Sequence, residues 1–266
     1  MVYNIDTVLR CFSCGDVVIK MTHSENEMFY VGIDACKAGW FAVSLESGSN
    51  FSIEIFSNIS GLWDNYHDAK LILIDIPIGL RESGLDERLC DKEARRLLGK
   101  RGSSVFPAPC RAAVYANSYE EASLINEKNT GRKLSQQIWN IIPKIKQVDT
   151  LLSTYISART KIREIHPEVC FWALAGRPME HPKKKREGFK ERLDVLSSLY
   201  RPSQELVECA LSGYYRRDVG RDDILDALVA ALTASKDRRG SQTIPETPEI
   251  DSKGLPMEMV YCCLNS

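Results

Sequence analysis

The sequence predicts a single α/β domain in which a mixed five-stranded sheet is flanked by helices, with a helical insertion between the fourth and fifth strands. Three observations carry this prediction. Residues 28–56 have the pattern of a three-stranded meander, Lys70 to Asp75 form an almost wholly apolar strand, and Asp222 to Ala234 form a strongly apolar helix. Strands and helices in this alternation assemble into a sheet covered by helices.

The composition is that of an ordinary globular protein. The chain has 266 residues, of which 44% are hydrophobic and 27% charged, and its formal net charge is -1. Such a chain can bury a substantial core, and its charge indicates that any nucleic-acid surface would have to be a local basic patch. The sequence has no apolar run of about 18 residues and no basic N-terminal segment followed by an apolar one, so we expect no membrane partner and a cytoplasmic location.

The domain is expected to span residues 28–266, after a polar N-terminal extension at residues 1–27. The extension contains Cys11 and Cys14, which are spaced as half of a zinc site. No second pair of ligands follows, and structural zinc takes four, so we expect the cysteines to be mostly reduced core residues.

The first three strands are expected at Met28 to Asp34, Trp40 to Leu45 and Phe51 to Phe56, the last of which alternates strictly between apolar and polar residues. Asn58 or Ser60 can cap a short helix after the meander. The fourth strand, Lys70 to Asp75, is apolar on both faces and therefore central.

Helical spacing of apolar residues dominates from about residue 84 to residue 160, which predicts the insertion. Its helices are expected at Asp86 to Leu98, Tyr119 to Lys128 and Ser135 to Ser157. A fifth strand at Lys161 to Ile165 stops before Pro167, and helices follow at residues 168–174, 188–199 and 203–212. After the helix that begins at Asp222, residues 238–249 are rich in Pro, Thr and Ser, and Leu255 to Leu264 can form an edge strand.

Four aspartates are the candidate catalytic residues. Asp34 and Asp75 each end an apolar strand, and in open α/β sheets such ends line the crevice that binds ligands. Asp223 and Asp226 are three residues apart and share one helix face. Oxygen ligands favour Mg²⁺ or Mn²⁺, and two such ions can clamp the oxygens of a phosphodiester. The structural alternative is that Asp34 accepts backbone hydrogen bonds and that the helix acids, with Asp222 as the N-cap, serve the helix alone.

His166 and Glu168 follow the fifth strand and can reach the same crevice. Glu168 can be a further metal ligand, and His166 can transfer protons near neutral pH. The alternative is a turn in which Glu168 stabilises the start of the next helix.

The loop from Lys100 to Arg111 is the expected substrate contact, because it combines cations and hydroxyls with two prolines that stiffen it. Its candidate residues are Lys100, Arg101, Ser103, Ser104 and Arg111, joined by Lys144 from an insertion helix. The alternative is a packed connection with solvated cations. The run Lys183 to Arg186 has the pattern of a phosphate-backbone patch and, equally, of a solvated helix start.

Several motifs together resemble the family designated domain of unknown function 429, over about residues 29–261. They are Gly32-Ile-Asp34, Ile74-Asp-Ile-Pro-Ile-Gly79, Ser104-Val-Phe-Pro-Ala-Pro-Cys-Arg111, Glu164-Ile-His-Pro-Glu168 and Asp222-Asp-Ile-Leu-Asp-Ala227. The resemblance implies a predicted nuclease of the RNase H-like superfamily, with acids laid out as in RuvC-type Holliday-junction resolvases. It assigns the metal ligands to Asp34, Asp75, Asp223 and Asp226, and it implies a homodimer. In those resolvases the fourth-strand acid is Glu, whereas here it is the shorter Asp75.

The leading functional hypothesis is a nuclease that hydrolyses phosphodiesters of DNA or RNA with two Mg²⁺ or Mn²⁺ ions. A nucleotide phosphotransferase with an actin-like fold is an alternative, although only Cys36 to Gly39 offers a phosphate turn and no second sheet copy is visible. A non-catalytic protein that binds metal or nucleic acid as a scaffold is the third hypothesis. The sequence has no GxSxG and no P-loop motif, which disfavours serine-hydrolase and P-loop chemistry.

Overall fold

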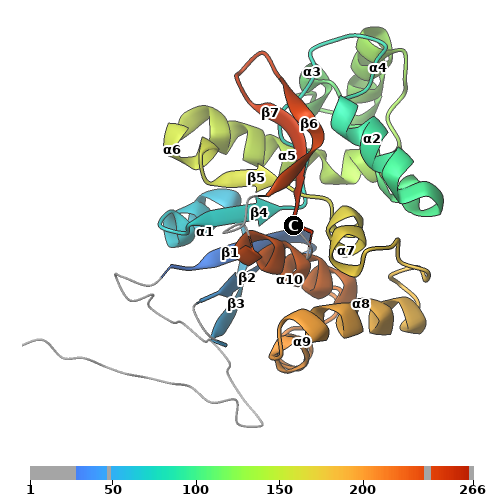
Figure 1. Ribbon diagram of the computed structural model, residues 1–266. Coiled ribbons are helices and arrows are strands. Elements are labelled where there is room, and N and C mark those ends of the chain that lie inside the picture. Colours follow the sequence, from blue (N-terminus) through green and yellow to red (C-terminus); the bar gives the residue numbers. More distant parts are fainter. Residues whose placement is uncertain (1–27, 47–48, 237–240, 264–266) are drawn as a thin grey trace, which may run out of the picture.

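The computed structural model describes residues 28–46, 49–236 and 241–263. Its main sheet has five strands in the order β3-β2-β1-β4-β5 (Figure 1). Strand β1 pairs antiparallel with β2 and parallel with β4, β2 pairs antiparallel with β3, and β4 pairs parallel with β5. The strands are β1 (Tyr30–Cys36), β2 (Gly39–Leu45), β3 (Phe51–Phe56), β4 (Leu71–Ile74) and β5 (Ile162–Glu164). The predicted mixed five-stranded sheet is confirmed, while Cys11 and Cys14 lie outside the described residues.

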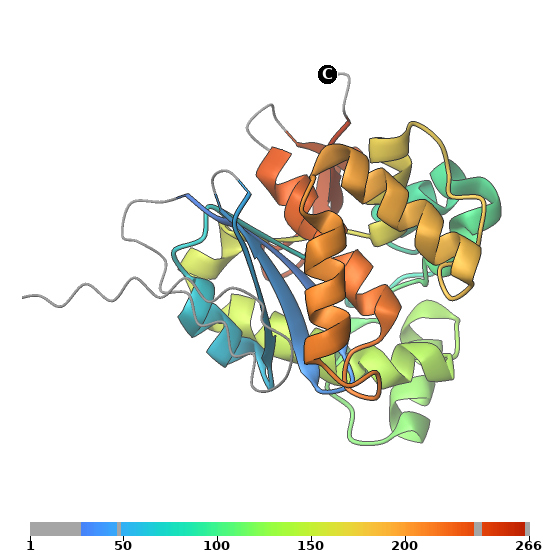
Figure 2. The ribbon, with the colours of Figure 1, turned by 90° about the horizontal axis from the view of Figure 1, so that it is seen from below.

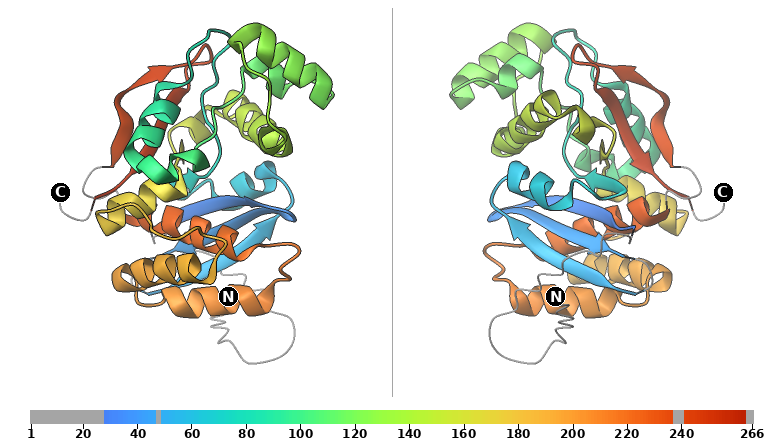
Figure 3. Two further views of the ribbon diagram at one scale, coloured as in Figure 1. Left: turned by 90° about the vertical axis from the view of Figure 1, so that its right-hand side faces the viewer. Right: turned by 90° about the vertical axis from the view of Figure 1, so that its left-hand side faces the viewer.

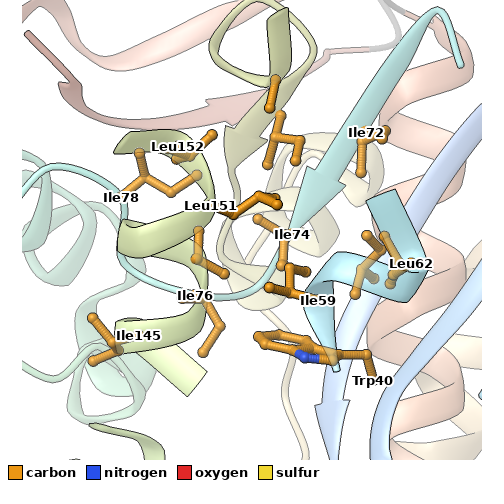
Figure 4. Packing of buried hydrophobic residues seen from close by; sticks show 14 of the residues in the cluster. Trp40, Ile59, Leu62, Ile72, Ile74, Ile76, Ile78, Ile145, Leu151 and Leu152 are labelled. Atoms are coloured by element: carbon orange, nitrogen blue, oxygen red, sulfur yellow. The ribbon is translucent and has the colours of Figure 1, made fainter. Parts of the chain in front are cut away.

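Helices cover both faces of this sheet, which lies as the middle layer in Figure 3. On one face, α1 (Ile59–Tyr66) and α5 (Gln136–Thr154) pack on Val31 and Ile33 of β1. Figure 4 shows this cluster, in which Ile74 of β4 lies among Ile59 of α1 and Leu151 of α5. Within the described chain, no helix is both long and apolar enough to cross a membrane.

The other face carries the helix that the sequence predicted most strongly. Helix α10 (Arg221–Lys236) crosses the sheet there, with α7 (Pro167–Ala175), α8 (Arg186–Leu199) and α9 (Ser203–Gly213) around it (Figure 2). A Cβ atom on Gly32 of β1 would lie 2.1 Å from both Ala227 O and Ala231 N of α10. Glycine at this position therefore allows the helix backbone to approach the strand and brings the first turns of α10 near the end of β1.

The predicted helical insertion between β4 and β5 is confirmed, with differences at its ends. It contains α2 (Leu89–Leu98), a 3₁₀ turn η1 (Gly99–Ser104), α3 (Arg111–Val114), α4 (Tyr119–Thr130), α5 and α6 (Ile156–Arg159). The segment from Ser135 to Ser157, which we predicted as one helix, breaks where Tyr155 adopts an extended conformation with φ -108° and ψ 101°.

The C-terminal region differs from the prediction. We expected a Pro-rich tail and one edge strand, but β6 (Gln242–Ile250) and β7 (Pro256–Tyr261) form an antiparallel two-stranded sheet of their own. Pro245 and Pro248 fall where the register between the strands is interrupted, between Ile244 and Glu249, so neither is needed as a donor in the ladder. The hairpin packs on α2 through an apolar cluster.

Candidate functional site

A cavity of about 550 Å³ lies at the carboxyl ends of β1, β4 and β5, the position at which the sequence predicted a ligand crevice. It brings together most of the predicted site residues. Those in its lining are Asp34, Asp75, Arg101, Ser103, Ser104, His166, Glu168 and Asp223.

The strand acids are placed by the sheet. Asp34 is the fifth residue of β1 and is buried, with its Oδ1 accepting a hydrogen bond of 2.8 Å from the backbone N–H of Ala35. Asp75 directly follows β4, and its backbone N–H donates to Ile33 O at 3.1 Å, which continues the parallel pairing. The two aspartates therefore leave neighbouring parallel strands side by side.

The helix acids come from the first turns of α10. Asp226 is fully buried and lies one turn after Asp223. We predicted Asp222 as the N-cap, but it lies inside the helix, and the Oδ2 of Asp223 instead accepts from the backbone N–H of Gly220 at 2.8 Å. The close contact of α10 with β1 at Gly32 sets these acids opposite Asp34.

Burial raises the pKa values of all four aspartates, and the charges of neighbouring acids add to it. The pKa of Asp34 lies well above its ordinary range, first because of burial and then because of the charges of Asp75, Asp226 and Asp223. Burial, with Asp226 as the next cause, raises the pKa of Asp75 to about 7. The pKa values of Asp223 and Asp226 are raised by burial as well. The fold thus brings several carboxyl groups together where little water can solvate their charges.

A lysine that the sequence analysis did not assign to the acids lies among them. Lys183 donates a short hydrogen bond to the Oδ2 of Asp226, and its Nζ is 4.0 Å from Asp222 Oδ2. Burial opposes its charge, but Asp226, Asp34 and Asp75 raise the pKa of Lys183 above its ordinary value. The sequence predicted a phosphate patch or a solvated helix start for the run that contains Lys183, so the run itself gave no signal for this contact.

His166 and Glu168 reach the cavity, as predicted. The Nε2 of His166 is 3.3 Å from Ser104 O, and because a carbonyl only accepts, this contact places the proton on Nε2. Burial lowers the pKa of His166, and its buried Nδ1 has no hydrogen-bond partner. Glu168 Oε1 accepts from Arg192, whereas its buried Oε2 has no partner. Both residues offer an unused lone pair near the acids.

A buried ion-pair network forms another wall of the cavity, and the sequence analysis did not predict it. Arg88 is 2% exposed and pairs with both oxygens of Glu164 at 2.8 Å. It also pairs with both oxygens of Asp91, at 2.6 and 3.1 Å, and Asp91 accepts from the backbone N–H of Ala108 at 3.0 Å. The one hint of this network in the sequence was Glu164, an acid beside the apolar Ile165 in the predicted fifth strand.

Three predicted substrate contacts lie elsewhere. Arg111 is buried among the carboxylates of Glu82, Asp149 and Asp251, which holds the insertion against the C-terminal hairpin. Lys144 donates to Gly39 O at 2.6 Å and lies over the ring of Trp40 at 4.6 Å. Lys100 is exposed in η1 and is not part of the cavity lining. The local sequence could not show that Arg111 and Lys144 are held by buried partners, which come from distant parts of the chain.

The acids are not arranged as a preformed metal centre. In the described part of the chain, no group of three or more His, Cys, Asp or Glu side chains could hold a metal ion as they are placed. Two features of the site nevertheless suit a cation. The buried Oδ1 of Asp226 has no hydrogen-bond partner, and a cation, the ammonium of Lys183, already contacts the same carboxylate. A divalent ion would therefore require side chains to move.

Comparison with known proteins identifies a family and nothing closer. No curated protein and no solved structure matches the chain. Residues 32–250 match the family described as protein of unknown function (DUF429), a range that includes Asp34, Asp75, Lys183 and both helix acids. Since the match covers most of the chain, this protein belongs to the DUF429 family.

Proposed function

We propose that the protein is a metal-dependent hydrolase of nucleic-acid phosphodiesters, with Asp34, Asp75, Asp223 and Asp226 as ligands of Mg²⁺ or Mn²⁺. One observation carries the proposal: Asp34, Asp75 and Asp223, from two strands and a helix, line one cavity with the buried Asp226 beside them, and the pKa values of all four are raised. Keeping such acids ionised together is costly unless a cation shares the site. Perturbed carboxylates in a cleft are typical of functional sites.

The donor chemistry favours these two ions. All four side chains offer carboxylate oxygens, the ligands that Mg²⁺ and Mn²⁺ prefer, and neither zinc nor a soft metal would be selected by them. When bound, such an ion would supply Lewis-acid activation of the phosphodiester. The carboxylate of Asp226 is the ligand that must first give up part of its contact with Lys183.

The rim of the cavity supports an anionic substrate. Arg101 is anchored there by hydrogen bonds to Met179 O and Glu180 O, and Ser103, Ser104 and Lys184 lie nearby in the lining. Cations and hydroxyls of this kind bind phosphate oxygens. Because the whole chain has a net charge of -1, this local group would have to supply the attraction for nucleic acid.

His166 is the candidate for moving a proton. It is neutral near pH 7 because burial lowers its pKa, and its Nδ1 is free to accept while Ser104 O fixes the ring. A neutral imidazole held in this way can take a proton from an attacking water. A cytoplasmic location and a homodimer, the latter implied by the family resemblance, complete the proposal.

Cleavage of labelled single-stranded DNA, single-stranded RNA and branched DNA in Mg²⁺ and in Mn²⁺ tests the proposal. Asp34→Asn should reduce the rate by at least about 100-fold, since it removes an oxygen ligand at the centre of the site. Asp194→Asn, at an exposed position on α8, is the matched control and should cleave like the wild type. Cleavage that survives Asp34→Asn contradicts the assigned site. A wild type that neither binds the ions nor cleaves any of the substrates would instead favour the scaffold hypothesis.

A further inference from the structure

Lys183 is the one member of its basic run that turns inward. Lys184, Lys185 and Arg186 are exposed, whereas Lys183 contacts Asp226 and is half-buried beside the acids. Its ammonium therefore lies at the acid cluster, whereas a surface patch that binds phosphates would require it to be exposed.

The segment that carries Lys183 is held in place by α8. The carboxylate of Glu191 accepts from the backbone N–H groups of Glu180, at 2.9 and 3.1 Å, and of His181, at 3.0 Å. Arg192, which is 1% exposed, donates to His181 O at 3.0 Å and also to Glu168 at the cavity. Arg192 thus supports both the segment before Lys183 and Glu168.

The start of α8 fits closely around the same segment. A Cβ atom on Gly188 would lie 2.1 Å from Pro182 O, so only glycine allows this packing. The backbone N–H of Lys185 donates to Pro182 O at 2.9 Å and closes a turn that contains Lys183. A solvated surface lysine would need none of these contacts, which indicates that the placement serves the site.

We propose that this site takes one divalent cation and that the Lys183 ammonium, held on Asp226, supplies the second positive charge in place of a second metal ion. The inference rests on the proposed function but takes Asp226 out of the ligand set, because Asp226 keeps the ammonium in place of the second metal ion that the sequence suggested. The divalent ion would be held on the side of Asp34, Asp75 and Asp223, while the ammonium donates a hydrogen bond to a phosphate oxygen of the substrate.

The number of Mn²⁺ ions bound per chain tests the inference, measured by calorimetry and by the loss of the free-ion signal in electron paramagnetic resonance. The wild type should bind one ion. Lys183→Met removes the charge at similar length and should bind two, because Asp226 and Asp222 become available. Lys185→Met, at an exposed position outside the cavity lining, and Lys183→Arg, which keeps the charge, should both stay at one.

The outcomes separate the two proposals. Two ions bound to the wild type, or one ion bound to a folded Lys183→Met, would overturn the inference and leave the proposed function standing. No ion bound to any variant would contradict the proposed function and the inference with it.

A second readout uses only the wild type, in case Lys183→Met fails to fold. Amine acetylation followed by mass spectrometry should modify Lys183 at least about tenfold more slowly than Lys184, because a paired ammonium is not nucleophilic. Protection should persist in saturating Mn²⁺. Rapid modification of Lys183 once Mn²⁺ is added would show that the ion displaces the ammonium, and would overturn the inference.

Discussion

Asp75→Asn should make the metal-free protein more stable and the metal-loaded protein less so. The amide is close to the carboxylate in size but carries no charge, so it relieves the repulsion among the acids and removes one ligand. Residues that destabilise the fold in order to bind or react are a common feature of functional sites. The substitution therefore separates a functional acid from a structural one, whose loss would lower stability in both states.

The pKa of Asp75 gives the size of the effect. It lies at about 7 against an ordinary value of 3.8, and at ~1.4 kcal/mol per pKa unit the difference is worth about 4 kcal/mol. Asp75 keeps some solvent access, so we expect about half of that, ~2 kcal/mol, or about 4–8 °C in Tm for a chain of this size.

The direction with pH follows from the raised pKa. For a carboxyl whose folded pKa is raised, stability is highest below the unfolded pKa and is lost as the pH rises to the folded value. Relative to the wild type, Asp75→Asn should thus gain little stability at pH 4 and the most stability above pH 7.

Thermal unfolding followed by circular dichroism at pH 5 and pH 8, with EDTA or with Mn²⁺, measures these differences. Mn²⁺ at 100 times its dissociation constant should stabilise the wild type by about 2.7 kcal/mol and Asp75→Asn much less, which reverses their order. Asp194→Asn should follow the wild type throughout. An Asp75→Asn protein that melts at or below the wild type at pH 8 in EDTA would show that the charge of Asp75 does not destabilise the metal-free fold.

The packing of α10, the Arg88 network and the cations near the cavity can each be tested separately. Gly32→Ala should cost at least about 3 kcal/mol in urea unfolding, since its Cβ would lie 2.1 Å from the α10 backbone, and a loss under 1 kcal/mol would contradict the packing. Arg88→Met should cost about 3–5 kcal/mol because it leaves two buried carboxylates unpaired, and an unchanged Tm would argue against the network. Arg101→Ala should weaken binding to single-stranded DNA, as measured by fluorescence anisotropy. It should also reduce the slope of the logarithm of the binding constant against the logarithm of the salt concentration by about one. Lys144→Ala should leave that binding unchanged, because its ammonium holds Gly39 O; equal losses in both variants would restore Lys144 as a substrate contact.

The sheet and its acids were predictable because local sequence encodes them. Apolar runs that end in Asp34 and Asp75 mark strand ends, and the spacing of Asp223 and Asp226 puts both on one helix face. The parallel pairing of β1 with β4 then brings the two strand acids together without any further signal.

The charged partners were not predictable, because their pairing depends on contacts between distant residues. Lys183 meets Asp226 across 43 positions of the sequence and Arg111 meets Asp251 across 140. A cation next to other cations looks solvated in the sequence, whether or not the fold places a carboxylate against it. The same limit applies to β6. In the sequence its prolines argue against a strand, and only the pairing with β7 shows that they lie where the register is interrupted, so that no hydrogen bond is required from them.

Crystals soaked in Mn²⁺ and measured at its anomalous absorption edge would show directly whether these acids bind a metal ion. We predict an anomalous peak in the cavity within about 2.2 Å of carboxylate oxygens of Asp34 and Asp75. The peak should be absent from crystals of Asp75→Asn soaked in the same way. A wild-type crystal with no peak in the cavity, or with Mn²⁺ only at surface carboxylates, would contradict the assignment of these acids as a metal site.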